Sequence, residues 1–167
     1  MMLPSILALD PGGFTGYMFR GPGANIKYGE LPLSASGHHL ALWKLLTDCR
    51  DEIERHDSDA SLTIVCERFD FRKTEQFRDK IDYISREYIG VVKLFVQSSG
   101  SKVRLRLQGA SEAKSFWTDD KLRKVGLYYP GSKHIRDAVR HYLYYVSFDL
   151  KDDRYLHMLR PKSKTEE

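Results

Sequence analysis

The sequence predicts one α/β domain built on a mixed sheet, and three observations lead to this class. Two short apolar runs, at 6–9 and 61–67, each end beside a carboxylate, a pattern typical of strands buried on both faces. A Gly-Pro-Gly turn joins two further strand-like segments near the start of the chain. Segments with helical periodicity separate the later strands and provide the long crossovers that parallel strands require.

The N-terminal part of the sheet is expected to be a strand followed by an antiparallel hairpin. The first strand, Ile6 to Asp10, is bounded by the breaker sequence Pro11-Gly12-Gly13. The next two strands, Phe14 to Arg20 and Asn25 to Leu31, flank the turn Gly21-Pro22-Gly23 and form the hairpin.

Two helices are expected to provide the crossovers. The first begins at Ser36 as its capping residue and ends near His56, before the strand Ser61 to Glu67. The second runs from about Thr74 to Val96, and Gly100 ends it. Apolar residues recur at steps of three and four along one face of each helix and predict that this face packs on the sheet. These residues are Leu42, Leu46, Cys49 and Ile53 in the first helix, and Phe77, Ile81, Ile84, Tyr88, Val91 and Phe95 in the second.

The C-terminal part begins with a strand, Lys102 to Gln108, in which basic and apolar residues alternate. One or two short helices follow within Ser111 to Lys124, and an aromatic-rich helix spans about Ser132 to Leu150. Residues after Lys151 are polar, and we expect them to be loosely held. We therefore expect a domain over 1–150 and a polar tail over 151–167.

Composition excludes several classes of protein. Two cysteines, Cys49 and Cys66, are too few for a disulfide framework or a four-cysteine zinc site, and their apolar surroundings predict core positions. No run approaches the ~18 apolar residues of a membrane span, and Asp10 comes too early for a secretory signal, so we expect a cytoplasmic protein without membrane contact. The net charge of +4 permits a polyanionic partner such as nucleic acid but does not identify one.

Two carboxylates, Asp10 and Glu67, close the first and fourth strands. Functional groups gather at the carboxyl ends of strands in α/β sheets, and parallel neighbours place those ends at one edge. Such a pair would repel unless a cation lay between them, and hard oxygen ligands suit Mg²⁺ or Mn²⁺. The alternative is that Asp10 caps a turn while Glu67 makes a surface ion pair.

The last helix presents His134, Asp137 and His141 on one face, because they are spaced by three and four residues. The aspartate adds an oxygen ligand, and an imidazole either binds metal or moves a proton. The alternative is a polar, solvent-exposed helix start.

The motifs together resemble those of the RuvC-type Holliday-junction resolvases in the RNase H-like nuclease superfamily. The matching segments, in the same order, are ILALDPGG at the N-terminus, IVCE before and including Glu67, and KHIRDAVRH in the last helix. The resemblance covers 3–146 and is closest to small bacteriophage RuvC-like resolvases. It implies an RNase H-like fold, with a mixed five-stranded sheet flanked by helices. It also implies a homodimer that acts on four-way DNA junctions, in the cytoplasm of the bacterial host if the protein is encoded by a phage.

The resemblance also implies the catalytic residues. Asp10, Glu67, His134 and Asp137 match the family's four catalytic positions, and Lys114 matches a lysine near the scissile phosphate. Two Mg²⁺ or Mn²⁺ ions would be held, with Asp10 bridging them, Glu67 and Asp137 each binding one, and His134 ligating metal or orienting water. Products would carry 5′-phosphate and 3′-hydroxyl ends. A second family lysine is absent, and Gln108 lies near its place.

Contacts with DNA are expected in two segments. The residues that follow Glu67 combine cations with aromatic rings suited to stacking on a base: Arg68, Phe69, Phe71, Arg72 and Lys73. In related resolvases an aromatic side chain in this loop separates base pairs, although Phe69 and Phe71 could equally pack under the long helix. The outer face of the last strand, with Lys102, Arg104 and Arg106, either contacts phosphates or blunts an exposed sheet edge.

Other functions fit parts of the same sequence. The long helix has a second side with Tyr83, Ile84 and Val92, where the resemblance implies dimerisation. The Asp-Pro-Gly-Gly loop also resembles the phosphate loop of actin-like ATPases, but these need two lobes, and no internal repeat supplies a second. Forks, flaps or other branched DNA are alternative substrates, and a non-catalytic nucleic-acid-binding module is the alternative of a different class.

Overall fold

The computed structural model describes residues 4–32, 37–68 and 79–160. It confirms the predicted α/β class, with a five-stranded sheet in the order β3-β2-β1-β4-β5. The strands are β1 Ser5–Asp10, β2 Phe14–Arg20, β3 Ile26–Pro32, β4 Leu62–Glu67 and β5 Val103–Gln108. The helices are α1 His38–His56, α2 Asp79–Ser98, α3 Ala110–Phe116, α4 Asp119–Lys124, α5 Lys133–Tyr144 and α6 Arg154–Met158.

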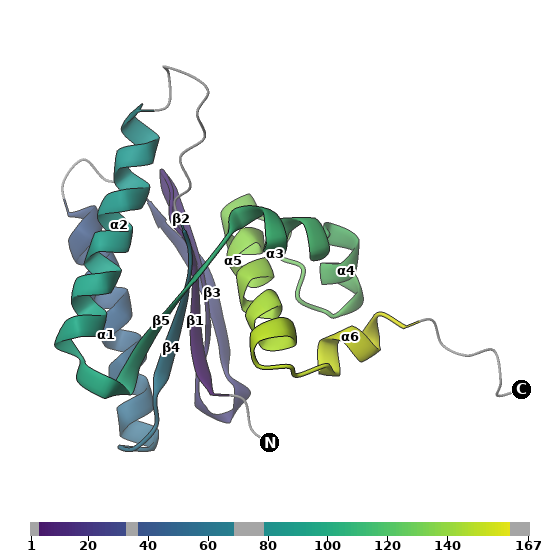
Figure 1. The fold of residues 1–167 in the computed structure, drawn as a ribbon, viewed down its shortest axis with the longest axis horizontal. Helices are drawn as coiled ribbons and strands as arrows, with labels where there is room; N and C mark the ends of the chain where they lie inside the picture. Colours follow the sequence, from purple (N-terminus) through teal and green to yellow (C-terminus); the bar gives the residue numbers. More distant parts are fainter. Residues whose placement is uncertain (1–3, 33–36, 69–78, 161–167) are drawn as a thin grey trace, which may run out of the picture.

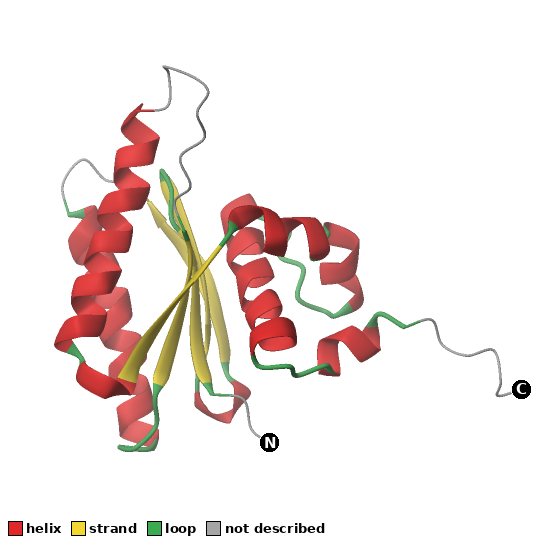
Figure 2. Cartoon of the chain, viewed as in Figure 1, coloured by secondary structure: helices red, strands yellow, loops and turns green. Residues whose placement is uncertain are grey.

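Helices cover both faces of this sheet. In Figure 1, α1 and α2 lie side by side on one face, while α5 crosses the other face with α3 and α4 outside it. Figure 2 shows the same three layers, helix, sheet and helix, by type of structure. None of the helices within the described ranges has the length and apolar character needed to cross a membrane.

The central strand β1 is antiparallel to β2 and parallel to β4. Leu9 lies opposite Cys66 in the parallel pair, so the next residues, Asp10 and Glu67, leave the sheet at the same edge. Glu67 in turn lies opposite Gln108 of β5, which is also parallel to β4. The predicted convergence of the two strand-ending carboxylates is therefore confirmed by the register.

Alternation along β1 divides the interior into two cores, since successive strand residues point to opposite faces. Leu7 and Leu9 join the core under α1 and α2, whereas Ile6 and Ala8 join the core under α5. Both cysteines are buried as expected. The predicted stripe of α1 is buried throughout: Leu42, Leu46, Cys49 and Ile53.

Several boundaries differ from the expected ones. Ser36 lies outside the described residues, and the residue that precedes α1 is Gly37 in a left-handed conformation. The last long helix ends as an α-helix at Tyr144 and continues as a short π-helix over Tyr145–Asp149. The segment after Lys151 is not loosely held up to residue 160, because it forms α6. Tyr155, Leu156 and Leu159 pack against the core under α5. The charged residues around these three positions make the segment polar on average, so its apolar residues were overlooked in the sequence.

Gly16 sets the closeness of α5 to the sheet. A Cβ atom at this position would lie 2.0 Å from the backbone oxygen of His134. The start of α5 is fixed from the other side by Ser132, whose hydroxyl oxygen accepts a hydrogen bond from the Ile135 N–H. Only glycine at 16 therefore lets the helix that carries His134 and Asp137 approach β2 this closely.

We expect Gly16→Ala to lower the free energy of unfolding by at least about 1–3 kcal/mol, because the new methyl group overlaps the α5 backbone. Urea unfolding followed by circular dichroism measures the change. Gly13→Ala is the matched control, since a Cβ there meets nothing within 4 Å. Equal stability of the two variants would contradict the packing argument.

Candidate active site

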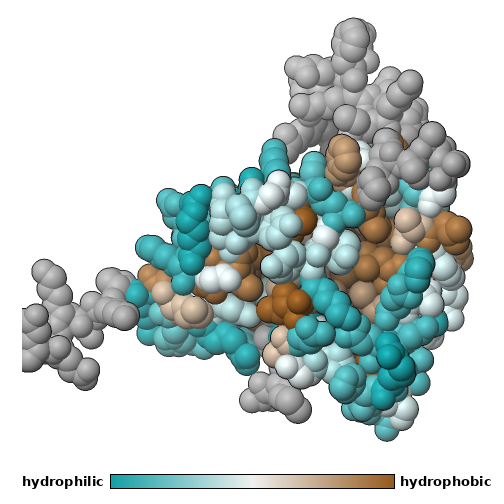
Figure 3. All heavy atoms as spheres, turned by 180° about the vertical axis from the view of Figure 1, so that it is seen from behind, coloured by the Kyte–Doolittle hydropathy of each residue, from teal (hydrophilic) through white to brown (hydrophobic). Residues whose placement is uncertain are grey.

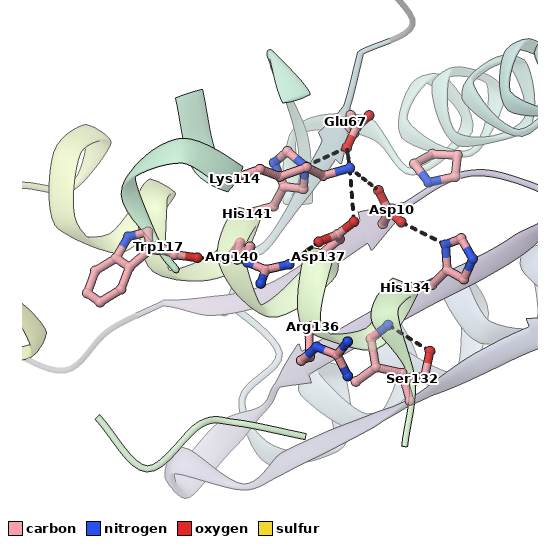
Figure 4. A network of polar contacts seen from close by, with 12 residues as sticks. Asp10, Glu67, Lys114, Trp117, Ser132, His134, Arg136, Asp137, Arg140 and His141 are labelled. Atoms are coloured by element: carbon pink, nitrogen blue, oxygen red, sulfur yellow. Dashed lines mark hydrogen bonds and ion pairs between the residues drawn. The ribbon is translucent and has the colours of Figure 1, made fainter. Parts of the chain in front are cut away.

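Three carboxylates converge at the edge of the sheet where β1 and β4 end. Asp10 closes β1, Glu67 closes β4, and Asp137 lies in the second turn of α5 (Figure 4). The side chains of Asp10 and Asp137 are buried, and that of Glu67 is largely buried. The structure thus brings together the acidic residues that the sequence predicted.

The Lys114 ammonium lies at the centre of this group. Its Nζ is 3.1 Å from Asp10 Oδ1, 2.7 Å from Glu67 Oε2 and 3.1 Å from Asp137 Oδ2. Burial lowers the pKa of Lys114, but the carboxylates of Asp10 and Glu67 raise it by more, so it lies above its ordinary value. One positive charge facing three carboxylates leaves the cluster with an excess of negative charge.

His134 extends the cluster toward solvent. Its Nδ1 lies 3.1 Å from Asp10 Oδ2, and this hydrogen bond raises the pKa of the imidazole. The pKa of Asp10 is itself raised, because its burial outweighs the contacts with His134 and Lys114. Asp10 and His134 therefore share a hydrogen bond in which either side chain can carry the proton.

Glu67 behaves in the opposite way to Asp10. Burial raises its pKa, but hydrogen bonds with His141 and Asp10, together with Lys114, lower it to about 2. Two neighbouring carboxyl groups with pKa values moved apart are typical of sites that handle protons and cations.

His141 is a site residue that the sequence analysis placed on the right helix face but did not assign. Its side chain is 0% exposed, and its Nε2 lies 2.8 Å from Glu67 Oε2. On the other side of the ring, Nδ1 lies 3.0 Å from Gln108 Oε1. The seven-residue interval from His134 to His141, two helical turns, was the available signal.

Arg140 positions Asp137 and was not found from the sequence. Its guanidinium contacts both Asp137 and Asp119, and its Nε donates to the Trp117 carbonyl at 2.7 Å. Because Asp119 begins α4, this largely buried arginine side chain connects the short helices to the acidic cluster. The Arg140–Asp137 pair has the i,i+3 spacing of one helix face, which was an available signal. The Arg140–Asp119 pair joins separate elements and has no such signal.

The residues present fit a divalent cation. The position they surround already holds one positive charge, the Lys114 ammonium. Asp10, Glu67 and His141 each offer a ligand atom, and these atoms lie within 4.8 Å of one another. Carboxylate oxygens suit Mg²⁺ and Mn²⁺, and an imidazole nitrogen is acceptable to Mn²⁺.

An open groove beside the cluster offers access to a substrate. Its lining includes acidic, basic and hydroxyl side chains: Glu67, Ala110, Ser111, Lys114, Ser115, Lys133, Asp137 and Arg140. At the opposite side of the cluster, Phe14 is exposed and its ring centroid lies 6.2 Å from that of His134.

The structure describes only some of the residues expected to contact DNA, and these differ in their partners. Arg68 is described and exposed, whereas Phe69, Phe71, Arg72 and Lys73 lie outside the described residues. Lys102 lies in a 3-10 turn rather than in β5, and its ammonium donates to the Ser58 carbonyl at 3.0 Å. Arg106 pairs with Asp149 at 2.9 Å, while Arg104 is exposed on the edge strand.

Comparison with solved structures establishes the fold class. A structure of Thermus thermophilus RuvC in complex with a Holliday junction substrate has a TM-score of 0.64 at 12% identity, covering 90% of this chain and 97% of that one. A second Thermus thermophilus RuvC structure has a TM-score of 0.58 at 13% identity, covering 88% and 96%. No family model matches the chain, and no curated protein matches it. The chain therefore has the RuvC-type, RNase H-like fold, as predicted, and its activity must be argued from the site.

We expect Lys114→Met to increase the affinity of the DNA-free protein for Mn²⁺ or Mg²⁺ by roughly tenfold or more. The ammonium competes with the metal for the carboxylates, and one neighbouring charge changes the affinity of a carboxylate for a proton by a similar factor. Isothermal titration calorimetry measures the affinity, with the exposed Lys93→Met variant as control. An unchanged affinity would show that the ammonium and the metal do not share a position.

We also expect the pKa of His134 in the metal-free protein to lie above the ordinary histidine value of about 6.5, because Asp10 accepts its hydrogen bond. Asp10→Asn removes the negative charge and should return the pKa toward that value. Titration of the imidazole signals by NMR tests both statements. The exposed Asp57→Asn variant is the control, and a His134 pKa insensitive to Asp10→Asn would argue against the coupling.

Proposed function

We propose that this protein is a metal-dependent, structure-selective DNA endonuclease that resolves Holliday junctions. The observation that carries the proposal is the convergence of Asp10, Glu67 and Asp137 around one cation position, beside an open groove. The fold adds support, because a structure with the same fold was obtained in complex with a Holliday junction substrate.

Asp10, Glu67 and Asp137 would hold two Mg²⁺ or Mn²⁺ ions. When bound, such ions stabilise the charge on the phosphoryl oxygens and on the attacking and leaving oxygens of an in-line displacement. The buried position of Asp10 and Asp137 supports this role, because their hydrogen bonds and ion pairs hold the carboxylates in fixed orientations before a ligand arrives.

His134 would assist the attacking water. When its Nδ1–H donates to Asp10, the lone pair of the ring lies on Nε2, where it can accept a proton from water. The half-exposed position of the ring keeps this nitrogen accessible from solvent. His134 is therefore proposed as the residue that orients the nucleophile or receives its proton.

Lys114 would contact the carboxylates in the absence of metal and the phosphate of DNA in its presence. In the absence of metal its ammonium neutralises the carboxylates, and cations that occupy the carboxylates would release it toward the groove that it lines. There it can contact a non-bridging oxygen of the scissile phosphate. Hydrolysis would leave 5′-phosphate and 3′-hydroxyl ends.

Charge makes DNA binding at this site depend on metal. Three carboxylates and the Lys114 ammonium sum to −2, and two divalent ions contribute +4, so the sum of these groups changes from −2 to +2. The cluster repels phosphate in the first state and attracts it in the second. Additional DNA contacts are proposed for Arg68 and Arg104, both exposed, and for Phe69, Phe71, Arg72 and Lys73.

A homodimer is proposed because a four-way junction requires two symmetric nicks. The side of α2 proposed for the contact carries Leu94, which is 58% exposed. Of the three residues that the sequence suggested for this contact, Val92 is fully buried in the core and Ile84 packs against that core. The side chain of Tyr83 lies outside the described part of the chain.

We expect the protein to nick a four-way junction at symmetric positions in Mg²⁺ or Mn²⁺, and Asp10→Asn to lower the rate by about a hundredfold to a thousandfold or more. DNA binding should persist or improve, because a negative charge near phosphate is removed. The assay compares labelled four-way, fork, flap and linear DNA, with product mapping on both strands.

The control is Asp48→Asn, an exposed carboxylate on α1 that pairs with Lys44 at 2.9 Å, away from the cluster. Normal cleavage by Asp10→Asn would refute the active-site assignment. Faster cleavage of forks or flaps would keep the nuclease function but replace the four-way junction as substrate.

A further inference from the structure

A chain of hydrogen bonds runs from the surface to the buried His141. Arg106 of β5 donates to Asp149 from Nε at 3.1 Å and from Nη2 at 2.9 Å. The Gln108 amide nitrogen lies 3.4 Å from Asp149 Oδ2, and Gln108 Oε1 lies 3.0 Å from His141 Nδ1. The imidazole therefore has a defined orientation, set by groups outside the acidic cluster.

This chain also defines which ring nitrogen carries the proton. An ionised carboxylate only accepts hydrogen bonds, so the Gln108 amide nitrogen donates to Asp149 and its oxygen faces His141. His141 Nδ1 must then be the N–H that donates to this oxygen. The other ring nitrogen, Nε2, faces the acidic cluster and lies 2.8 Å from Glu67 Oε2 in a hydrogen bond. A metal ion bound to Nε2 would take the place of the proton in this hydrogen bond.

We infer that His141 Nε2 is a metal ligand that, with Asp10 and Glu67, forms a cation site preferring Mn²⁺ to Mg²⁺. The three ligand atoms lie within 4.8 Å of one another, close enough to share one ion. A metal-bound histidine characteristically donates its other N–H to a carbonyl or carboxylate, as Nδ1 does here to Gln108. Imidazole nitrogen favours first-row transition metals, whereas Mg²⁺ prefers oxygen ligands and water.

The inference rests on the proposed metal-dependent function and specifies its metal. The partners of the two ring nitrogens of His141 also explain why a histidine is fully buried at this position. His141 has one hydrogen-bond partner on each side of its ring, Gln108 at Nδ1 and Glu67 at Nε2. What distinguishes it from a purely structural histidine is that its ligand atom lies within 4.8 Å of those of Asp10 and Glu67.

Two substitutions of His141 distinguish a role as metal ligand from a role that only positions Glu67. His141→Gln places an amide N–H near the Nε2 position and can still donate to Glu67, but it does not supply an imidazole nitrogen. His141→Asn keeps a donor near the Nδ1 position for Gln108. We expect both to weaken Mn²⁺ binding by about tenfold or more while changing Mg²⁺ binding much less. Circular dichroism and urea unfolding verify that each variant folds.

The direct measurement is pulsed electron paramagnetic resonance of the full chain with Mn²⁺, which detects coupling to a ligating nitrogen-14. His38, His39 and Glu87 form another group of possible ligands, so all samples carry His38→Ala and His39→Ala. His134→Gln is added to remove the other imidazole near Asp10. We expect the nitrogen coupling to persist in this background and to disappear when His141→Gln or His141→Asn is added.

The outcomes separate this inference from the proposed function. Mn²⁺ that binds in an Asp10-dependent way without a nitrogen coupling from His141 overturns the inference and leaves the metal-dependent nuclease intact. Equal losses of Mn²⁺ and Mg²⁺ affinity in both His141 variants, or retained Mn²⁺ affinity in His141→Gln, also overturn it. Absence of any Asp10-dependent binding of Mn²⁺ or Mg²⁺ refutes both.

Discussion

Repulsion among three buried or largely buried carboxylates is the constraint around which this end of the molecule is built. Asp10, Glu67 and Asp137 come from three elements, and burial strengthens the repulsion between them. The Lys114 ammonium contacts all three and relieves it in part. One ammonium cannot balance three negative charges, and the Arg140 guanidinium that contacts Asp137 is shared with Asp119. The remaining negative charge is the basis of the proposed divalent-ion site.

Each of the three carboxylates has its own hydrogen-bond or ion-pair partner in the surrounding structure. His134 contacts Asp10, His141 contacts Glu67, and Arg140 contacts Asp137, so each carboxylate has a partner besides Lys114. All three partners lie on α5. This helix lies close to the sheet at Gly16, where a Cβ atom would overlap the backbone of α5. On the face seen from behind, hydrophilic and hydrophobic patches lie next to one another (Figure 3).

Much of the candidate site could be predicted because its signals are local. Asp10 and Glu67 end apolar runs, and His134 and Asp137 are three residues apart on a helix, so strand direction and helix period suffice to bring them together. His141 shared that helix face, but its contact with Gln108 depends on the pairing of β4 with β5. The Arg140–Asp119 pair and the packing of α6 are contacts between distant segments with no shared period, and Val92 faces the core rather than a second side of α2.

The sequence by itself determined the α/β class, the strand order along the chain and the acidic residues of the site, because periodicity, turn residues and strand-ending carboxylates act over short distances. Only the tertiary structure decided which charges neutralise one another. Lys114 is 104 residues from Asp10 in the sequence but 3.1 Å away in space, and His141 is 74 residues from Glu67 but 2.8 Å away. Electrostatic interactions depend on distance and burial, which follow from packing and not from spacing along the chain.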